Sequence, residues 1–174
     1  MLNEKEALKG QGRPIESLLR ETPLRHLGAP APPIAALGTP AGDIVLRMRE
    51  AGAGAALVVD GNGRLAGIFT ERDHLDKLVL ADVMTQTGFG PQSPIESVMT
   101  PSPCTLSPDA KVGDAIRLMT EGGYRHIPLV EEDGRTWGLV SARDVVRFIA
   151  DHFPTEVYNL PPGFQQQIRT CEGG

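Results

Sequence analysis

The apolar positions of this chain alternate between helical and extended spacing, and the same order occurs twice. Over residues 42–51 and 112–121 the apolar side chains recur at the spacing of one helix face. A glycine follows each segment, as is common at helix C-termini. Two short apolar runs joined by a glycine-containing turn come next, which predicts one β-hairpin over 55–69 and another over 126–140.

Each half of this pattern also has an extended segment before its first predicted helix, at residues 34–37 and 104–106. A last helix is predicted to begin at Thr70 in the first half and at Ser141 in the second, and a short helix is expected around residues 15–19. The element order is therefore strand, helix, strand, strand, helix, twice over. We expect an α+β fold built from two βαββα units.

The two halves also share sequence. A shift of 71 residues aligns residues 23–73 with 94–144 without a gap, and 14 of the 51 aligned pairs are identical. Because so short a unit buries little apolar surface by itself, we expect the repeats to share a core and to place a ligand at their seam. The predicted division is an extension at 1–20, a first repeat at 21–80, a linker at 81–93, a second repeat at 94–152 and a tail at 153–174.

Composition narrows the classes of function. The 174 residues are 40% apolar and 22% charged, which is typical of a soluble globular protein. A net charge of −5 argues against nucleic acid or an anionic membrane as a partner. The polar N-terminus does not resemble a signal peptide, and no apolar run is long enough to span a membrane. Two cysteines and four dispersed histidines show no metal-ligand spacing. Two cysteines are also too few for a disulfide scaffold, so a reducing cytoplasm is the expected compartment.

The same seven-residue pattern closes each repeat, at 67–73 and 138–144: glycine, two apolar residues, threonine or serine, any residue, arginine and aspartate. One interpretation is structural, because a hydroxyl residue followed three positions later by an acid is a near relative of the helix capping box. The other is functional, because an arginine in the first turn can bind phosphate and an exposed aspartate can accept both hydroxyls of a ribose. The repetition, and an arginine that a cap does not need, favour a nucleoside phosphate.

Together these features resemble a tandem pair of cystathionine-β-synthase (CBS) domains, also called a Bateman module, over about residues 23–149. The resemblance rests on V-M-T-P at 98–101, on Y-R-H-I-P-L-V at 124–130 and on the two closing heptads. It implies α+β, βαββα repeats related by a pseudo-two-fold axis, with nucleotide clefts between them. It also implies that the heptad aspartate holds the ribose diol, that backbone contacts the adenine, and that basic residues meet the phosphates.

The resemblance carries ligand-binding positions onto both repeats. In the second repeat they are Thr100, Thr105, Arg125, His126, Ile127, Pro128, Ser141, Arg143 and Asp144. In the first repeat, where weaker binding is expected, they are Ile34, Ala55, Ala56, Leu57, Thr70, Arg72 and Asp73. Weaker binding is expected because Gly54 and Ala55 stand where the second repeat has Arg125 and His126. A phosphate beside His126 is expected to raise the pKa of its imidazole.

The resemblance predicts a regulatory module that binds an adenine nucleotide and transmits its occupancy to a separate, unknown partner. AMP, ADP or ATP is the expected ligand, with Mg²⁺ accompanying ATP, and no required cofactor, metal site or catalytic residue is predicted. A homodimer is expected, held by apolar faces of the helices that follow Thr70 and Ser141. The alternatives are S-adenosylmethionine or a cyclic dinucleotide as ligand, a constitutive adaptor with vestigial clefts, and a nucleotide hydrolase, for which no general base is visible.

Overall fold

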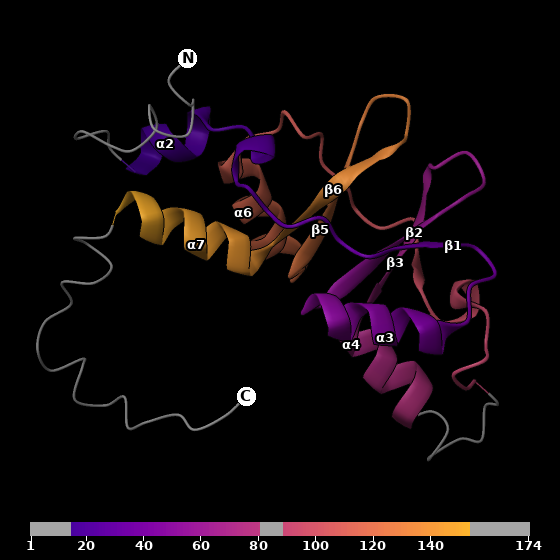
Figure 1. Cartoon of the computed structure of the whole chain (residues 1–174). Coiled ribbons are helices and arrows are strands. Elements are labelled where there is room, and N and C mark those ends of the chain that lie inside the picture. Colours follow the sequence, from indigo (N-terminus) through magenta and orange to yellow (C-terminus); the bar gives the residue numbers. More distant parts are fainter. Residues whose placement is uncertain (1–14, 81–88, 154–174) are drawn as a thin grey trace, which may run out of the picture.

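The computed structural model describes residues 15–80 and 89–153, in which helices and strands alternate along the chain (Figure 1). The first half contains α2 (Ile15–Glu21), η1 (Leu24–His26), β1 (Ile34–Ala36), α3 (Ala41–Ala51), β2 (Ala55–Val59), β3 (Leu65–Thr70), α4 (Glu71–Asp73) and the π-helix η2 (His74–Leu80). The second half contains η3 (Ile95–Ser97), β4 (Thr100–Pro101), α6 (Val112–Gly122), β5 (His126–Val130), β6 (Thr136–Ser141) and α7 (Ala142–His152). In these described ranges, no helix combines the length and apolar character needed to cross a membrane.

The hairpins and the helices before them lie where the sequence predicts them, which confirms the α+β class and the two βαββα repeats. β2 and β5 have the expected bounds, and β3 and β6 each extend one residue further, to Thr70 and Ser141. These two residues are also the N-caps of the closing helices, as predicted. Gly52 and Gly123 end α3 and α6 at φ of 58° and 67°, a conformation that favours glycine because it has no Cβ to clash.

The extended segment predicted at 104–106 is only partly formed. Leu106 makes a single parallel bridge to β5, whereas β1 pairs with β2 over three residues. In the first repeat the amides of Leu57 and Leu37 donate to the carbonyls of Pro33 and Val59 and so hold β1 in place. Pro128 and Pro108 stand at the equivalent positions, and proline has no amide to donate. The regular strand near this place is instead β4, Thr100–Pro101, which pairs with β3 of the first repeat.

Two sheets form, and they meet at the tips of the hairpins. One sheet has the order β1-β2-β3-β4, with β1 parallel to β2 and the other neighbours antiparallel, and the other sheet consists of β5 and β6. At the tips, the amide of Leu65 donates to the carbonyl of Gly134 over 3.2 Å, and Arg64 and Arg135 form an antiparallel bridge. Because Arg64 and Arg135 are equivalent in the repeat, this contact lies on the pseudo-two-fold axis.

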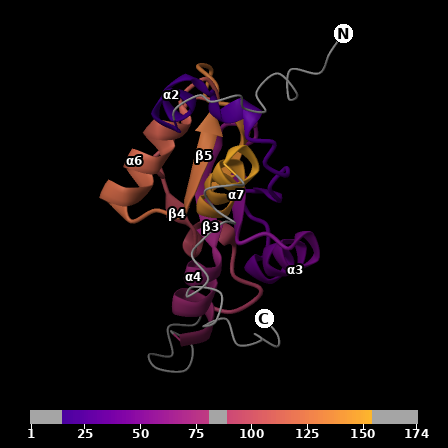
Figure 2. The same cartoon turned by 90° about the vertical axis from the view of Figure 1, so that its left-hand side faces the viewer.

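Each repeat completes the core of the other with a segment that precedes its own strands. We call residues 15–27 and 94–99 the leading segments. Leu18 and Leu24 are buried in the second core, among residues of α6, β5, β6 and α7. Ile95 and Val98 are buried in the first core, among residues of α3, β2 and β3. Figures 1 and 2 both show α2 beside α6 and away from α3, the first long helix of its own half.

Backbone hydrogen bonds hold the leading segments in place. The amide of Leu24 donates to the carbonyl of Ala110 over 2.9 Å, and the amide of Ile95 donates to the carbonyl of Thr39 over 2.9 Å. The 71-residue shift that aligns the repeats converts one of these bonds into the other. The exchange is therefore symmetric. The second leading segment runs directly into β4 and so places β4 at the edge of β3.

Gly67 in β3 and Gly138 in β6 are equivalent, but β4 crosses Gly67. A Cβ on Gly67 would lie 2.9 Å from the carbonyl oxygen of Thr100 and closer still to Met99, whereas a Cβ on Gly138 would have open space around it. We expect Gly67→Ala to lower the free energy of unfolding by about 1–3 kcal/mol and Gly138→Ala to change it by less than about 0.5 kcal/mol. Urea denaturation measures both, and equal effects would contradict the close approach of β4.

Candidate functional site

A cleft of about 600 Å³ lies where the exchanged strand β4 runs along β3. One wall is the end of β3 and the start of α4, which contribute Thr70 and Asp73. The other wall is β4 with the residues after it and the start of β5, which contribute Thr100, Arg125 and His126. The lining therefore combines a hydroxyl and a carboxylate from one repeat with basic side chains from the other.

Asp73 caps the helix on which it lies. Its Oδ2 accepts hydrogen bonds from the amide and the hydroxyl of Thr70 over 3.0 and 2.7 Å, and Thr70 Oγ1 accepts from the amide of Asp73 over 3.3 Å. This is a capping box, so the structural interpretation of the heptad holds for these two residues. Asp73 is 9% exposed, and the exposed carboxylate assumed for ribose binding is in fact largely buried.

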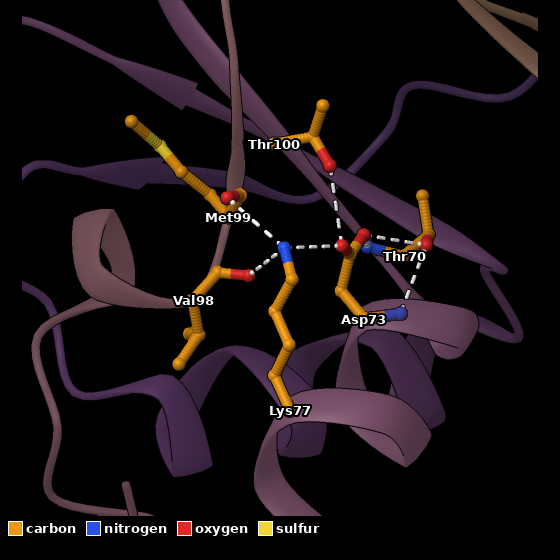
Figure 3. A network of polar contacts seen from close by, with 6 residues as sticks. All are labelled: Thr70, Asp73, Lys77, Val98, Met99 and Thr100. Atoms are coloured by element: carbon orange, nitrogen blue, oxygen red, sulfur yellow. Dashed lines mark hydrogen bonds and ion pairs between the residues drawn. The ribbon is translucent and has the colours of Figure 1, made fainter. Parts of the chain in front are cut away.

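The second oxygen of Asp73 lies in a network that joins α4 and η2 to the second leading segment (Figure 3). Lys77 Nζ lies 2.8 Å from Oδ1, and the hydroxyl of Thr100 donates to the same oxygen over 3.2 Å. The Lys77 ammonium also donates to the carbonyls of Val98 and Met99, over 2.8 and 3.2 Å. Lys77 follows Asp73 by four residues, a spacing that places both side chains on one helix face.

The pKa of Asp73 reflects two opposing effects. Burial acts to raise it, because the charged carboxylate loses contact with water. The hydrogen bonds from Lys77 and Thr70 and the positive charge of Lys77 together outweigh burial, so the pKa lies below its ordinary value of 3.8. At neutral pH the site therefore contains an ionised carboxylate paired with an ammonium.

Asp144 caps α7 in the same way but lacks the second set of partners. Its Oδ2 accepts hydrogen bonds from the amide and the hydroxyl of Ser141 over 2.9 and 2.5 Å. From the described residues its Oδ1 accepts no hydrogen bond, and the guanidinium of Arg147 lies 3.9 Å away. Phe148 stands at the position equivalent to Lys77 and is buried in the second core. The two heptad aspartates thus make the same capping hydrogen bonds, and the partners of their Oδ1 atoms differ.

Arg125 and His126 form the basic wall of the cleft, where Arg125 is exposed and His126 is half-buried. Burial lowers the pKa of His126 below 6.5, and the carboxylates of Glu71 and Asp144 act in the opposite direction. The pKa of His126 is therefore lowered in the protein alone, and a bound phosphate would have to raise it from that lowered value.

The structure groups the predicted ligand residues across the repeats rather than within them. Six of them line the one cleft: Thr70, Arg72, Asp73, Thr100, Arg125 and His126. Three more, Ser141, Arg143 and Asp144, lie at the start of α7 and outside this lining. The physical reason is the exchanged leading segment, which places the strand carrying Thr100 beside the helix of the other repeat.

The other predicted residues lie in the hairpin cores or at the surface. Five are buried in the first strands of the two hairpins: Ala55, Ala56, Leu57, Ile127 and Pro128. Ile34 and Thr105 are exposed, and neither lines the cleft. In the described part of the chain no group of three His, Cys, Asp or Glu residues could hold a metal ion.

Sequence reasoning did not single out Lys77, Glu71 or Tyr124, which contact Asp73 or line the cleft. A signal for Lys77 was present, because an acid and a lysine four residues apart on a predicted helix form a common ion pair. The contact of Lys77 with the carbonyls of Val98 and Met99 had no such signal, since it joins segments of different repeats.

Comparison with known proteins identifies the repeats. The sequence profile of the CBS domain matches residues 24–78 and 95–151, which together make up more than half of the chain. The chain belongs to the CBS domain family. The two matches also confirm that the CBS domains form a tandem pair.

Three relatives illustrate how far the likeness extends. A 17.7 kDa protein of Acidianus ambivalens is 34% identical over 104 residues, which are 60% of this chain and 58% of that protein. The structure of a protein from Burkholderia ambifaria, described as a signal-transduction protein with CBS domains, has 30% identity and a TM-score of 0.62, covering 74% of this chain and 93% of that one. The crystal structure of CBSX2 in complex with AMP has 25% identity and a TM-score of 0.58, covering 72% and 94%. The chain spans between 51% and 58% of the length of the first curated relatives it matches.

The lowered pKa of Asp73 predicts a pH-dependent contribution to stability. Because the pKa is lower in the folded protein than in the unfolded chain, the contribution is complete above about pH 4 and is lost as the pH falls through the lowered value. At pH 7 we expect Asp73→Asn to cost about 1 kcal/mol, after allowance for the partial exposure of Lys77. Urea unfolding of wild type and variant from pH 7 to pH 3 should show this difference shrinking below pH 3.8. A difference that stays constant over this range would contradict the pairing.

Proposed function

We propose that this CBS pair is a regulatory module that binds an adenine nucleotide and transmits its occupancy to a separate partner. The observation that carries the proposal is the combination of Thr70 and Asp73 with Arg125 and His126 in one cleft. Two basic side chains suit a phosphate, and a hydroxyl and a carboxylate suit a ribose once the carboxylate is released from its partners within the protein. The volume of about 600 Å³ lies within the range of small-ligand sites.

The lining also indicates how a nucleotide would lie. Its phosphate would meet Arg125 and His126, its ribose would approach Asp73, and its base would pack against the apolar side chain of Ile68. The relative CBSX2 has been crystallised in complex with AMP, which supports an adenine nucleotide as the ligand class. ATP would bring Mg²⁺ with its phosphates, bound by the nucleotide rather than by a protein site.

Regulation would follow from the position of the cleft. Its walls come from both repeats, so a ligand that contacts both walls favours the arrangement in which they are closest. This gives a binding event a structural output without any catalytic step. We therefore propose a binding function and no enzymatic one, with S-adenosylmethionine and cyclic dinucleotides as the other ligands to test.

Two exposed apolar residues extend the proposal to a homodimer. Leu75 and Val146 are equivalent in the repeat, follow the two heptads, and are 51% and 65% exposed. Exposed apolar side chains of this size favour burial, and a second copy of the chain would supply a matching surface. Such a dimer, acting on another protein in the cytoplasm, is the setting that we propose for the module.

Nucleotide binding predicts a change in thermal stability. A ligand at 100 times its dissociation constant adds about 2.7 kcal/mol to the stability of the folded state. We expect AMP, ADP or ATP to raise the melting temperature, with S-adenosylmethionine and a cyclic dinucleotide measured beside them. If none of these ligands at millimolar concentration shifts the melting temperature, the constitutive adaptor becomes the better interpretation.

The position of Arg125 predicts that it recognises the phosphate charge of the nucleotide and makes no contact with its base. Arg125→Ala should weaken AMP binding by roughly 10- to 100-fold, the size of one or two lost charge-assisted hydrogen bonds, and leave adenosine binding nearly unchanged. Titration calorimetry of both ligands measures this. Arg117→Ala, on the exposed side of α6, is the matched control and should affect neither ligand. Equal losses for AMP and adenosine would show that Arg125 supports the fold rather than the phosphate.

A further inference from the structure

The hydrogen-bonding capacity of Asp73 is already used by the protein itself. An ionised carboxylate offers about four lone-pair positions to donors. Thr70 supplies two donors to Oδ2, while Lys77 and Thr100 supply one each to Oδ1. Two ribose hydroxyls would need two of these positions. Asp73 therefore has no position to offer a ribose as long as Lys77 and Thr100 stay in place.

Lys77 is held by more than its ion pair with Asp73. Its ammonium has three protons, and three acceptors lie within hydrogen-bond distance: Asp73 Oδ1 at 2.8 Å and the carbonyl oxygens of Val98 and Met99 at 2.8 and 3.2 Å (Figure 3). The side chain is nevertheless 38% exposed, so water can replace these acceptors when it moves. The contact is thus stable in the protein alone and can be displaced by a competing ligand.

The second repeat shows the same carboxylate without this ammonium. Phe148 replaces Lys77, and from the described residues Asp144 Oδ1 accepts no hydrogen bond. The cap is the same in both repeats, so the cap does not determine whether the second oxygen is available. Two differences determine it, because Lys77 is matched by Phe148 and Thr100, the other donor to Oδ1, is matched by Ala29.

We infer that Lys77 sets the ribose specificity of the cleft by occupying the Asp73 oxygen that a ribose diol would use. The inference rests on the proposed function and deepens it. A nucleotide in this cleft is held by its phosphate and its base, and its ribose contributes only after Lys77 moves. A ligand that does displace Lys77 also releases the carbonyls of Val98 and Met99, which belong to the exchanged leading segment.

The test compares AMP with 2′,3′-dideoxyadenosine monophosphate, which has no ribose diol, by titration calorimetry. All proteins carry Asp144→Asn, which removes the second heptad carboxylate and keeps an acceptor for the Ser141 cap. With Lys77 present, the two ligands should bind within about threefold of each other. In Lys77→Met, AMP should bind at least about 10-fold tighter, the size of one freed charge-assisted bond, and the dideoxy ligand should change by less than about twofold.

Two further variants locate the effect. Adding Asp73→Asn to Lys77→Met should abolish the gain for AMP, because the freed acceptor is no longer charged. Arg147→Met removes the cation near the other heptad and should leave both affinities unchanged. If Lys77→Met does not fold, Lys77→Gln keeps a neutral donor at the same place and should give a smaller gain in the same direction.

Each outcome decides the inference. AMP binding that is unchanged or weaker in Lys77→Met overturns the role of Lys77 and leaves the proposed function standing. A wild-type cleft that already prefers AMP by 10-fold or more over the dideoxy ligand overturns it as well. If none of these proteins binds either ligand, the inference fails, and the thermal-stability series on the protein with Asp144 intact decides the proposed function separately. Tighter AMP binding in Lys77→Met, lost again with Asp73→Asn, establishes it.

Discussion

The exchange of leading segments between the two repeats is the constraint on which the rest of the structure depends. Leu18 and Leu24 fill the second core, and Ile95 and Val98 fill the first. Neither repeat can bury its apolar face without the other, since a unit of this length has too little core of its own. Separating the repeats would open both cores at once. A ligand that changes how the repeats meet therefore acts on the whole module.

The same exchange creates the cleft and determines its chemistry. Because β4 runs along β3, the hydroxyl of Thr100 reaches Asp73 across 27 residues of sequence, and Lys77 reaches the carbonyls of Val98 and Met99. The two oxygens of Asp73 therefore have different partners. One oxygen caps α4, and the other pairs with the ammonium group of Lys77. Under the proposed function, a ligand that needs this carboxylate would compete with bonds that also join the repeats, and its binding would thereby be coupled to their arrangement.

A repeated motif does not make two equal sites. Both heptads form capping boxes, and both aspartates are largely buried. Their surroundings differ because Lys77 is matched by Phe148, and because Arg125 is matched by Gly54. One cleft thus combines the basic wall with an occupied carboxylate, whereas Asp144 keeps an oxygen that accepts no hydrogen bond from the described residues and has only the Arg147 guanidinium, 3.9 Å away, beside it. Divergence at a few neighbouring positions is enough to give two copies of the same pattern different surroundings.

Features that depend on neighbours a few residues apart, or on periodicity, follow from the sequence alone. These are the hairpin strands, the glycine ends of α3 and α6, the caps at Thr70 and Ser141, and the family. The sequence also indicated most of the residue types of the site. Tertiary packing determines that Thr100 donates to Asp73, that Arg125 lines the same cleft as Asp73 while Asp144 lies outside that lining, and that the segment at 104–106 forms one bridge instead of a strand. The reason is physical: local propensity and capping act within one or two helical turns, whereas a free carboxylate oxygen depends on donors that the fold brings from another repeat.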